Sequence, residues 1–363
     1  MTTARSACKT SRTISSRSRS RYPWASAERV TISSMLEDRQ RLLPQAIADL
    51  AEQVKSAAER ITSVVIKTPV EPMPDLAPDS GAETFFKLEN QQQTGSFKLR
   101  GASNKILSLS PAEAAAGVIA ASNGNHGLGV AAAARRAGIA AEIYVSSLVS
   151  PAKARRIEEF GARIQRAGND PLEAELAARA AAERQGKVFI SPYNDAQVIT
   201  GQGTIAVELL QQVPELDAIF VAVGGGGLIG GIGAYIKSAS SRTEIVGCWP
   251  ENSPVLYESI KAGRIIDVPE QPTLSESTAG GLEPGSVTLP IGAQVIDRSA
   301  LVTEDEILHA MRCVRDLRGW TIEGAAAVAV AAFLNDQKRY AGKRVAIIIC
   351  GGNCSEKVLK ELG

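Results

Sequence analysis

Short apolar runs alternate with longer alanine-rich stretches along this chain from about residue 84 to its end. The apolar runs span residues 84–88, 118–122, 141–145, 188–190, 218–223, 244–248 and 344–350, and the helical patterns between them include 151–160, 171–185 and 197–212. Strands that are apolar throughout and separated by helices are typical of a parallel sheet with both faces covered. The alternation therefore predicts an α/β fold.

Neither a tandem repeat nor a linker-like stretch interrupts the chain after residue 35. A second domain would then be an insertion into the first rather than an addition to its end. We expect a large domain built from residues 35–116 and 191–363, and a small inserted domain built from residues 117–190.

The first 34 residues differ in charge from the rest of the chain. They hold six arginines and one lysine against one glutamate, a net charge of +6, so the remaining residues carry −5 of the overall +1. We expect a disordered, basic, serine-rich leader and a cytoplasmic protein, with an organellar transit peptide as the alternative. The near-zero total charge gives no case for a nucleic-acid or membrane partner, and no apolar run is long enough to cross a membrane.

Three glycine-rich segments come directly after three of the predicted strands. They are residues 122–127, 224–227 and 351–353. Ligands of open α/β sheets bind just beyond the carboxyl ends of the strands. Any one segment could be only a tight turn into a helix, but three of them can contribute to a single site.

The tetraglycine Gly224–Gly227 carries the most information of the three. Four residues without Cβ let successive backbone N–H groups converge, and a helix that begins near Leu228 adds the positive end of its dipole, so the segment predicts a phosphate cradle. A nucleoside triphosphate is not expected, because no Gly-Lys-Ser/Thr follows. Residues 127–132 imitate a dinucleotide fingerprint, but the next strand lacks the acidic residue that such a site needs.

Lys98 stands beside Phe97 at the start of a predicted helix. Partial burial and the helix N-terminus both favour the uncharged amine, which a Schiff base requires. Taken alone, Lys98 could equally be an ordinary surface lysine. Together with a phosphate cradle and a polar Asn-His loop, it indicates an aldehyde cofactor that bears a phosphate, namely pyridoxal 5'-phosphate.

Four motifs make the pattern specific. SFKLRGA at 96–102, SNGNHG at 122–127, GGGGLIGG at 224–231 and CGGN at 350–353 resemble, in this order, the serine/threonine dehydratase group of fold-type II pyridoxal-phosphate enzymes, which includes threonine dehydratases and serine racemases. The resemblance covers roughly residues 60–363. It implies a fold similar to the tryptophan synthase β subunit, with two open, twisted, mostly parallel sheets covered by helices, and a homodimer or higher homo-oligomer.

The resemblance also assigns roles to residues. It implies Lys98 as the catalytic Schiff-base lysine. It places around the cofactor Phe97, Lys98, Asn125, Gly224, Gly225, Gly226, Gly227, Leu228 and Cys350, with Asn125 at the 3-oxygen and Cys350 facing the pyridine nitrogen. It places Ser122, Asn123 and His126 in the loop that receives the substrate carboxylate.

The side chain at Cys350 favours a lyase. A thiol is a neutral, weak donor, so the ring nitrogen would stay largely unprotonated and a carbanion at Cα would expel a β-leaving group. We therefore expect dehydration and deamination of a β-hydroxy amino acid, L-threonine and/or L-serine, to a 2-oxo acid and ammonia. The alternatives are racemisation, β-replacement of the cysteine-synthase type, and a binding protein without activity.

Three departures from the group's pattern narrow this interpretation. Asn123 stands where some serine racemases carry a second serine, and a carboxamide cannot transfer protons at neutral pH, so racemisation is disfavoured. Trp249 stands where the same relatives have a glutamate that binds a divalent cation, so no metal is expected. Glu323 is retained from the group's Ile-Glu-Pro, with either a functional role or helix capping. We also expect the polar loop 275–285 to lie on the substrate side of the site.

Overall fold

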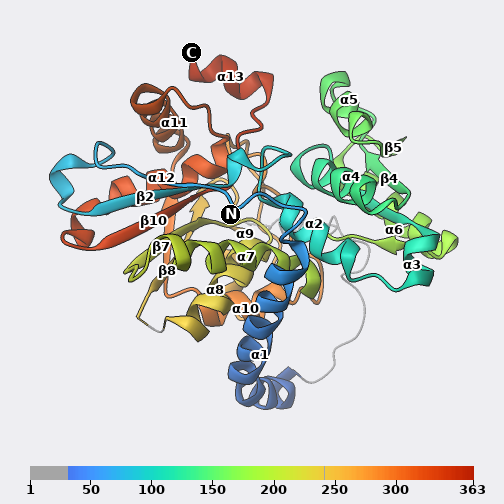
Figure 1. The fold of residues 1–363 in the computed structure, drawn as a ribbon, viewed down its shortest axis with the longest axis horizontal. Helices are drawn as coiled ribbons and strands as arrows, with labels where there is room; N and C mark the ends of the chain where they lie inside the picture. The colour runs from blue at the N-terminus through green and yellow to red at the C-terminus, as the bar shows by residue number, and fades with distance from the viewer. Residues whose placement is uncertain (1–31, 241) are drawn as a thin grey trace, which may run out of the picture.

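The computed structural model describes residues 32–240 and 242–363 (Figure 1). The predicted leader therefore lies outside the described residues, except that positions 32–34 form the first turn of helix α1 (Ile32–Ile61). Two separate sheets with helices around them make up the rest, so the predicted α/β architecture with two mostly parallel sheets is confirmed.

The larger sheet has six strands in the order β1-β2-β10-β7-β8-β9. Their bounds are β1 (Val70–Pro72), β2 (Glu83–Leu88), β10 (Arg344–Ile349), β7 (Ala218–Ala222), β8 (Glu244–Pro250) and β9 (Arg298–Val302). All neighbouring pairs are parallel apart from β1 and β2. The central strands β10 and β7 are almost wholly buried, as their apolar sequences require.

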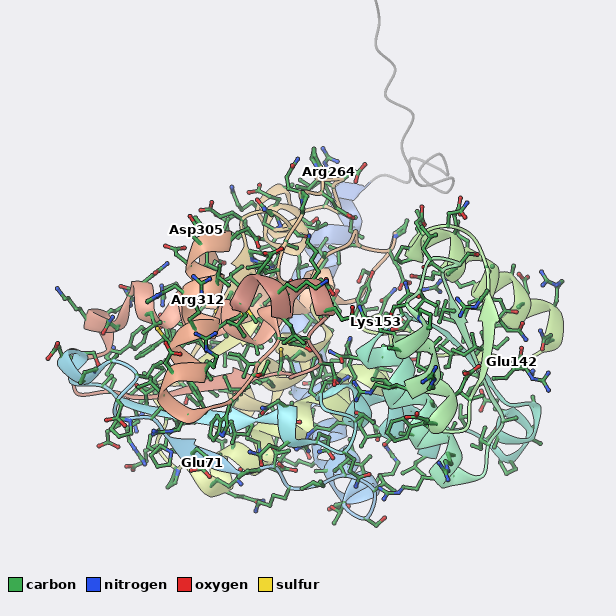
Figure 2. All side chains as sticks on the ribbon, turned by 90° about the horizontal axis from the view of Figure 1, so that it is seen from above. Glu71, Glu142, Lys153, Arg264, Asp305 and Arg312 are labelled. Atoms are coloured by element: carbon green, nitrogen blue, oxygen red, sulfur yellow. The ribbon has the colours of Figure 1, made fainter. Side chains whose placement is uncertain are left out.

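The smaller sheet has four parallel strands in the order β5-β4-β3-β6. They are β5 (Arg163–Arg166), β4 (Ala141–Val145), β3 (Val118–Ala121) and β6 (Val188–Phe189). In Figure 1 this sheet and its helices form the green part on the right, apart from the six-stranded sheet. In Figure 2, Glu71 lies on the left side of the molecule, Glu142 lies on the right, and Lys153 lies between them, with its Nζ 3.5 Å from Glu276 Oε2.

The sequence pattern missed three strands, β1, β5 and β9. Each is an edge strand and none is a continuous apolar run: β1 contains a proline, β5 reads Arg-Ile-Gln-Arg, and β9 begins with Arg-Ser. Edge strands bear charges and prolines because only one of their sides pairs. These three strands therefore cannot be recognised as buried apolar runs.

The remaining helices are α2 (Lys98–Leu107), α3 (Pro111–Ala116), α4 (Asn125–Ala137), α5 (Pro151–Glu159), α6 (Pro171–Gln185), α7 (Ala196–Gln212), α8 (Gly227–Ala239), α9 (Val255–Ala262), α10 (Thr288–Val295), α11 (Glu304–Arg318), α12 (Gly324–Asn335) and α13 (Glu356–Leu362). Three short 3-10 turns complete the set: η1 (Pro78–Ser80), η2 (Glu89–Gln91) and η3 (Gln337–Tyr340). Helix α12 is buried on every side from Gly324 to Phe333 and packs against β7 and β10. In the described part of the chain, no helix combines the length and the apolar character needed to cross a membrane.

Helix α7 connects the parts of the molecule that matter for the site. It packs on α1, α2 and α8. A Cβ on Gly201 would lie 2.6 Å from the Cα of Gly101, so α2 and α7 cross with their backbones almost in contact. Glycine at this crossing lets α2, which begins with Lys98, pack directly on α7.

Candidate active site

Lys98 is the first residue of α2 and lies behind the carboxyl ends of the large sheet's strands. Its Nζ donates a hydrogen bond to the backbone oxygen of Pro192 at 2.8 Å. Among the described residues, no carboxylate forms an ion pair with Lys98. Burial lowers the pKa of this amine to about 8. A minor fraction of Lys98, about a tenth at pH 7, is therefore the uncharged nucleophile, far more than for an ordinary lysine.

The start of α2 is held by the strand next to it. The backbone N–H of Phe97 donates to the oxygen of Cys350 at 3.0 Å, and Ser96 forms a bridge with Gly351. A Cβ on Gly129 of α4 would lie 3.0 Å from the carbonyl carbon of Lys98. The predicted segment 351–353 and helix α4, which begins within the predicted segment 122–127, thus meet at the start of α2.

The tetraglycine loop, Gly224–Gly227, forms a closed cradle between β7 and α8. A Cβ on Gly225 would lie 2.5 Å from the ring of Tyr193, and one on Gly224 would lie 2.8 Å from the Cα of Thr278. Gly226 adopts a φ of +86°, which favours glycine. No acceptor among the described residues bonds the backbone N–H groups of these four glycines. Unpaired N–H groups at a helix N-terminus are an anion site.

Asn125 and Glu323 form a polar pair beside Lys98. The Nδ2 of Asn125 donates to both carboxylate oxygens of Glu323, at 3.1 and 2.9 Å, and its Oδ1 accepts from Asn353 Nδ2 at 2.7 Å. Burial raises the pKa of the Glu323 carboxyl. Glu323 is the N-cap residue of α12, yet its side chain makes no capping bond, so the capping alternative for this side chain is wrong.

Cys350 directly follows the last residue of β10 and lies near Glu323. Its Sγ lies 4.0 Å from Glu323 Oε1, and its side chain is buried. Burial, followed by the nearby Glu323, raises the pKa of the thiol well above its ordinary value. Cys350 is therefore a neutral thiol and offers no positive or negative charge to a ligand.

The three residues predicted for the substrate loop use their side chains within the protein. Ser122 Oγ accepts from the N–H of Gly124 at 3.1 Å. The amide of Asn123 bonds Ser146 twice, to Oγ at 3.1 Å and from N–H at 3.0 Å. His126 Nε2 lies 2.9 Å from the carbonyl oxygen of Ile190, so this nitrogen carries the hydrogen. Burial, with repulsion from Lys98, lowers the pKa of His126 to about 3, and the imidazole is neutral.

Sequence reasoning missed the segment between β6 and α7. Pro192 accepts the hydrogen bond of Lys98, and Tyr193 packs against the tetraglycine loop. Ser191, Tyr193 and Asn194 also hold Glu283, at 3.2, 2.8 and 3.0 Å. The sequence did indicate this segment, because it is polar and directly follows the predicted strand 188–190, and ligands of α/β sheets bind beyond the carboxyl ends of strands.

Trp249, at the position where relatives carry a metal ligand, is fully buried. Its ring packs on Tyr257, with 5.6 Å between ring centroids, and covers Gly247. The indole fills the end of β8 with apolar surface. The expectation that the protein needs no metal stays a prediction.

The residues present fit pyridoxal phosphate. The amine of Lys98, which has no carboxylate partner, can bond an aldehyde, and the free N–H groups of the tetraglycine loop can bind a phosphate. Asn125 carries an amide donor, which in this structure is bonded to Glu323. The neutral thiol of Cys350 matches a pyridine nitrogen that is not protonated. No other site in the described residues combines a buried unpaired lysine with such a cradle.

Comparison with known proteins agrees with this fit. The family described as "Pyridoxal-phosphate dependent enzyme" matches residues 61–351. The chain is 39% identical over 313 residues to an L-threonine ammonia-lyase of Thermotoga maritima, covering 86% of this chain and 77% of that protein. It is 34% identical to a serine racemase of Arabidopsis thaliana, covering 83% and 92%. The processed form of threonine deaminase isoform 2 from Solanum lycopersicum has a TM-score of 0.82 at 30% identity, covering 86% of this chain and 92% of that one.

Proposed function

Since the chain belongs to the family of pyridoxal-phosphate dependent enzymes, we propose that it converts a β-hydroxy amino acid, L-threonine and/or L-serine, into a 2-oxo acid and ammonia. The relatives that act as threonine ammonia-lyases support this reaction. The observation that carries the proposal is the position of Lys98, whose amine has only the backbone oxygen of Pro192 as its hydrogen-bond partner. It lies next to the buried thiol residue Cys350, whose backbone oxygen accepts from the N–H of Phe97 at 3.0 Å.

Residues on four segments would hold the cofactor. Lys98 would bond its aldehyde, with Phe97 beside it, and the tetraglycine loop with Leu228 would bind its phosphate. Asn125 would donate to the 3-oxygen, and Cys350 would face the ring nitrogen. When bound, pyridoxal phosphate supplies a conjugated ring that accepts the electron pair left at the substrate's Cα.

The protein's own groups would then move the protons. Lys98, once released by the incoming amino group, is a base whose pKa of about 8 suits removal of the α-proton near neutral pH. The electron pair from the Cα–H bond forms the Cα–Cβ double bond as the Cβ–O bond breaks, and the hydroxyl leaves as water with the proton that Lys98 took from Cα. The released enamine takes up a proton from solvent at Cβ, and water then replaces nitrogen at Cα, which gives ammonia and the 2-oxo acid. His126 and Cys350 are both neutral, so neither places a second charge beside the amine of Lys98.

Elimination rather than racemisation is supported by Asn123. Racemisation needs a proton donor on the substrate face opposite Lys98, and both ends of the Asn123 amide are engaged by Ser146. A carboxamide has no transferable proton at neutral pH. Serine racemase therefore remains the second candidate, favoured only by the relatives that bear this name.

The decisive experiment is a panel of L- and D-amino acids offered to the purified enzyme loaded with pyridoxal phosphate. We expect 2-oxobutanoate and ammonia from L-threonine, or pyruvate and ammonia from L-serine, in equal amounts. Formation of D-serine without pyruvate would establish the racemase instead. If no β-hydroxy amino acid gives a 2-oxo acid, the dehydratase function is wrong.

Two further expectations accompany this function. The two sheets would be two domains, a large cofactor domain from residues 35–116 and 191–363 and a small domain from residues 117–190. The enzyme would be a homodimer or a higher homo-oligomer. Sedimentation velocity of the loaded enzyme tests the second expectation, and a monomer across micromolar concentrations would overturn it.

A further inference from the structure

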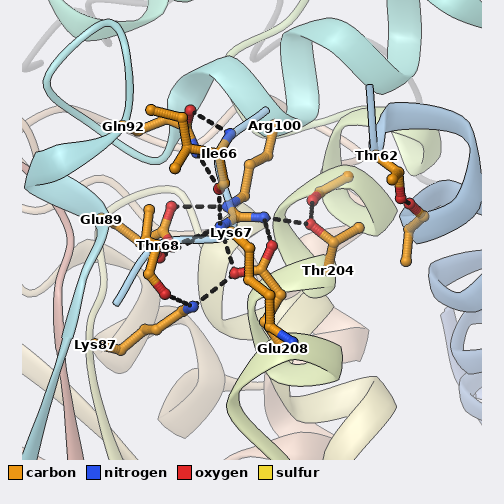
Figure 3. Close-up of polar contacts among 12 residues, drawn as sticks. Thr62, Ile66, Lys67, Thr68, Lys87, Glu89, Gln92, Arg100, Thr204 and Glu208 are labelled. Atoms are coloured by element: carbon orange, nitrogen blue, oxygen red, sulfur yellow. Dashed lines mark hydrogen bonds and ion pairs between the residues drawn. The ribbon is translucent and has the colours of Figure 1, made fainter. Parts of the chain in front are cut away.

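Four charged side chains lie together behind the start of α2, away from the pocket (Figure 3). They are Lys87 of β2, Glu89 of η2, Arg100 of α2 and Glu208 of α7, called here the buried charge cluster. The first three have no exposed side-chain surface, and Glu208 has 15%. Two positive and two negative groups make the cluster neutral overall.

Arg100 is the centre of the cluster. Its guanidinium forms two bidentate pairs, with Glu89 at 2.7 and 2.8 Å and with Glu208 at 2.7 and 2.9 Å. Further contacts reach the Oγ1 of Thr204 and the backbone oxygen of Ile66, both at 3.3 Å. The planar guanidinium thus fixes two carboxylates from different elements in one plane, which an ammonium group cannot do.

Lys87 closes the other side of the cluster. Its Nζ donates to Glu208 Oε2 at 2.6 Å, to the backbone oxygen of Thr68 at 2.7 Å and to Gln212 Oε1 at 2.9 Å. Thr68 Oγ1 in turn donates to Glu89 Oε1 at 2.6 Å. The cluster therefore joins β2, η2, α2, α7 and the segment at Thr68 in one hydrogen-bond network.

The cluster and the pocket share two elements. Lys98 and Arg100 lie two residues apart in the first turn of α2, where the N–H of Arg100 donates to the oxygen of Phe97 at 3.0 Å. Helix α7, which carries Glu208, begins directly after the segment that contains Pro192, the hydrogen-bond acceptor of Lys98. The alignment of α2 against α7 therefore sets where Lys98 Nζ lies relative to Pro192.

Stability alone does not account for so many buried charges. The free energy needed to remove two opposite charges from water is about as large as the free energy gained from their attraction. Apolar side chains of similar volume therefore stabilise a core as well or better. Unlike apolar packing, a network of bidentate hydrogen bonds fixes how the elements that it joins are aligned with one another.

From this arrangement we infer that the buried charge cluster sets the position of Lys98, with Arg100 as its positioning residue. The inference rests on the proposed function only for the identity of the reaction. None of the hydrogen-bond partners of the Arg100 side chain belongs to the residues that would hold the cofactor, and Arg100 acts by holding the first turn of α2 against η2 and α7.

The test compares Arg100→Met and Arg100→Lys with Arg298→Met. Arg298 at the start of β9 is a matched control, because it bonds Tyr340 Oη at 2.6 Å and pairs with Asp336 at 3.0 Å, far from the carboxyl ends of the strands. For each variant we would measure the pH at which the visible band of lysine-bound pyridoxal phosphate changes, the rate of borohydride trapping at Lys98 located by mass spectrometry, kcat, KM and the unfolding midpoint.

We expect Arg100→Met to slow trapping, to shift the pH midpoint of the band, and to lower kcat by about 100-fold, because a displacement of about 1 Å has this effect on a positioned group. Arg100→Lys keeps the charge but should not restore kcat, since one ammonium cannot bind both carboxylates bidentately. Arg298→Met should lower the unfolding midpoint without changing the band or kcat. If Arg100→Met does not fold, Arg100→Lys and the isosteric Glu208→Gln provide the same comparison.

The inference is overturned if the Arg100 variants keep wild-type trapping rates and spectra, or if Arg100→Lys restores both fully. Failure of the proposed function is a separate result, because it concerns the products of the wild-type enzyme. Trapping of added pyridoxal phosphate at Lys98 reports on position even when no 2-oxo acid is formed.

Discussion

The first turn of α2 carries two buried cations in opposite circumstances. Arg100 is surrounded by two carboxylates in the buried charge cluster, whereas Lys98 has only a backbone oxygen as its hydrogen-bond partner. Burial alone would lower the pKa of both groups, but the carboxylates raise the pKa of Arg100 above its ordinary value. Lys98 has no such partner, and its pKa falls to about 8.

The same contrast holds for the carboxylates of the two regions. Burial favours the neutral acid in each case, but Arg100 and Lys87 hold the pKa of Glu89 below its usual value, while Glu323 has only neutral donors in contact and its pKa is raised. Burial with a charged partner thus produces a permanent ion, and burial without one produces a group that can gain or lose a proton. A permanent ion pair can hold structural elements together, whereas a group that gains or loses a proton can take part in proton transfer.

The largest expected effect separates the two cations of α2. Lys98→Ala removes the amine that we propose bonds the cofactor, so we expect the visible band to disappear and kcat to fall by at least about 10,000-fold. The matched control is Lys105→Ala, in the last turn of the same helix, where the side chain pairs with Asp195 at 2.7 Å. A normal visible band in Lys98→Ala would show that another lysine bonds the cofactor.

A smaller effect is expected when a partner is removed from the paired region. Glu89→Gln leaves the guanidinium of Arg100 with one carboxylate in place of two, and breaking a buried pair in this way costs about 3 kcal/mol. Because the pKa of Glu89 is lowered in the folded state, its contribution is present above its unfolded pKa and is lost as the pH falls. Urea unfolding should therefore give a large destabilisation at pH 7 and a smaller one in acid. An equal loss at both pH values would contradict the ion-pair explanation.

The amino-acid sequence was sufficient for one of these two regions. Glycine loops after apolar strands and a lysine beside a helix start have local signatures, so the tetraglycine loop and Lys98 could be singled out in advance, whereas Asn125 and Cys350 were placed beside them by the resemblance to a known family. The buried charge cluster has no local signature. Lys87, Arg100 and Glu208 look like surface charges in sequence, and only the packing of β2, α2 and α7 brings them together.

The fold divides along a similar line. Central strands such as β4, predicted at 141–145, could be found because burial on both faces requires an apolar run. The edge strands β5 and β9 could not, since their one unpaired side tolerates arginine and serine. Likewise, Pro192 acts through a backbone oxygen, which no residue type signals, and the bond to it depends on how α7 packs against α2.

The next effect in size has the opposite sign to that of Glu89→Gln. In the cofactor-free protein, folding lowers the pKa of Lys98 from 10.5 to about 8, so the folded state holds its proton less tightly than the unfolded chain does. Lys98→Met should therefore stabilise the cofactor-free protein at pH 7 by up to about 3 kcal/mol, and the gain should vanish as the pH rises from about 8 to 10.5. Unfolding by urea across this range measures it. A destabilised variant at pH 7 would mean that Lys98 is compensated by a charge, as Arg100 is.

The smallest expected effect concerns the unpaired carboxyl. Folding raises the pKa of Glu323 above 4.5, so its proton contributes stability below pH 4.5 that is lost as the pH rises through the folded pKa. Glu323→Gln keeps the shape and an acceptor for Asn125 but cannot ionise. It should leave stability unchanged at pH 4 and raise it by about 1 kcal/mol at pH 7. Glu89→Gln is the matched control, because the same change at a paired carboxyl should destabilise at pH 7. Two changes of the same sign would mean that Glu323 has a cationic partner, and the contrast between the two regions would then not hold for carboxylates.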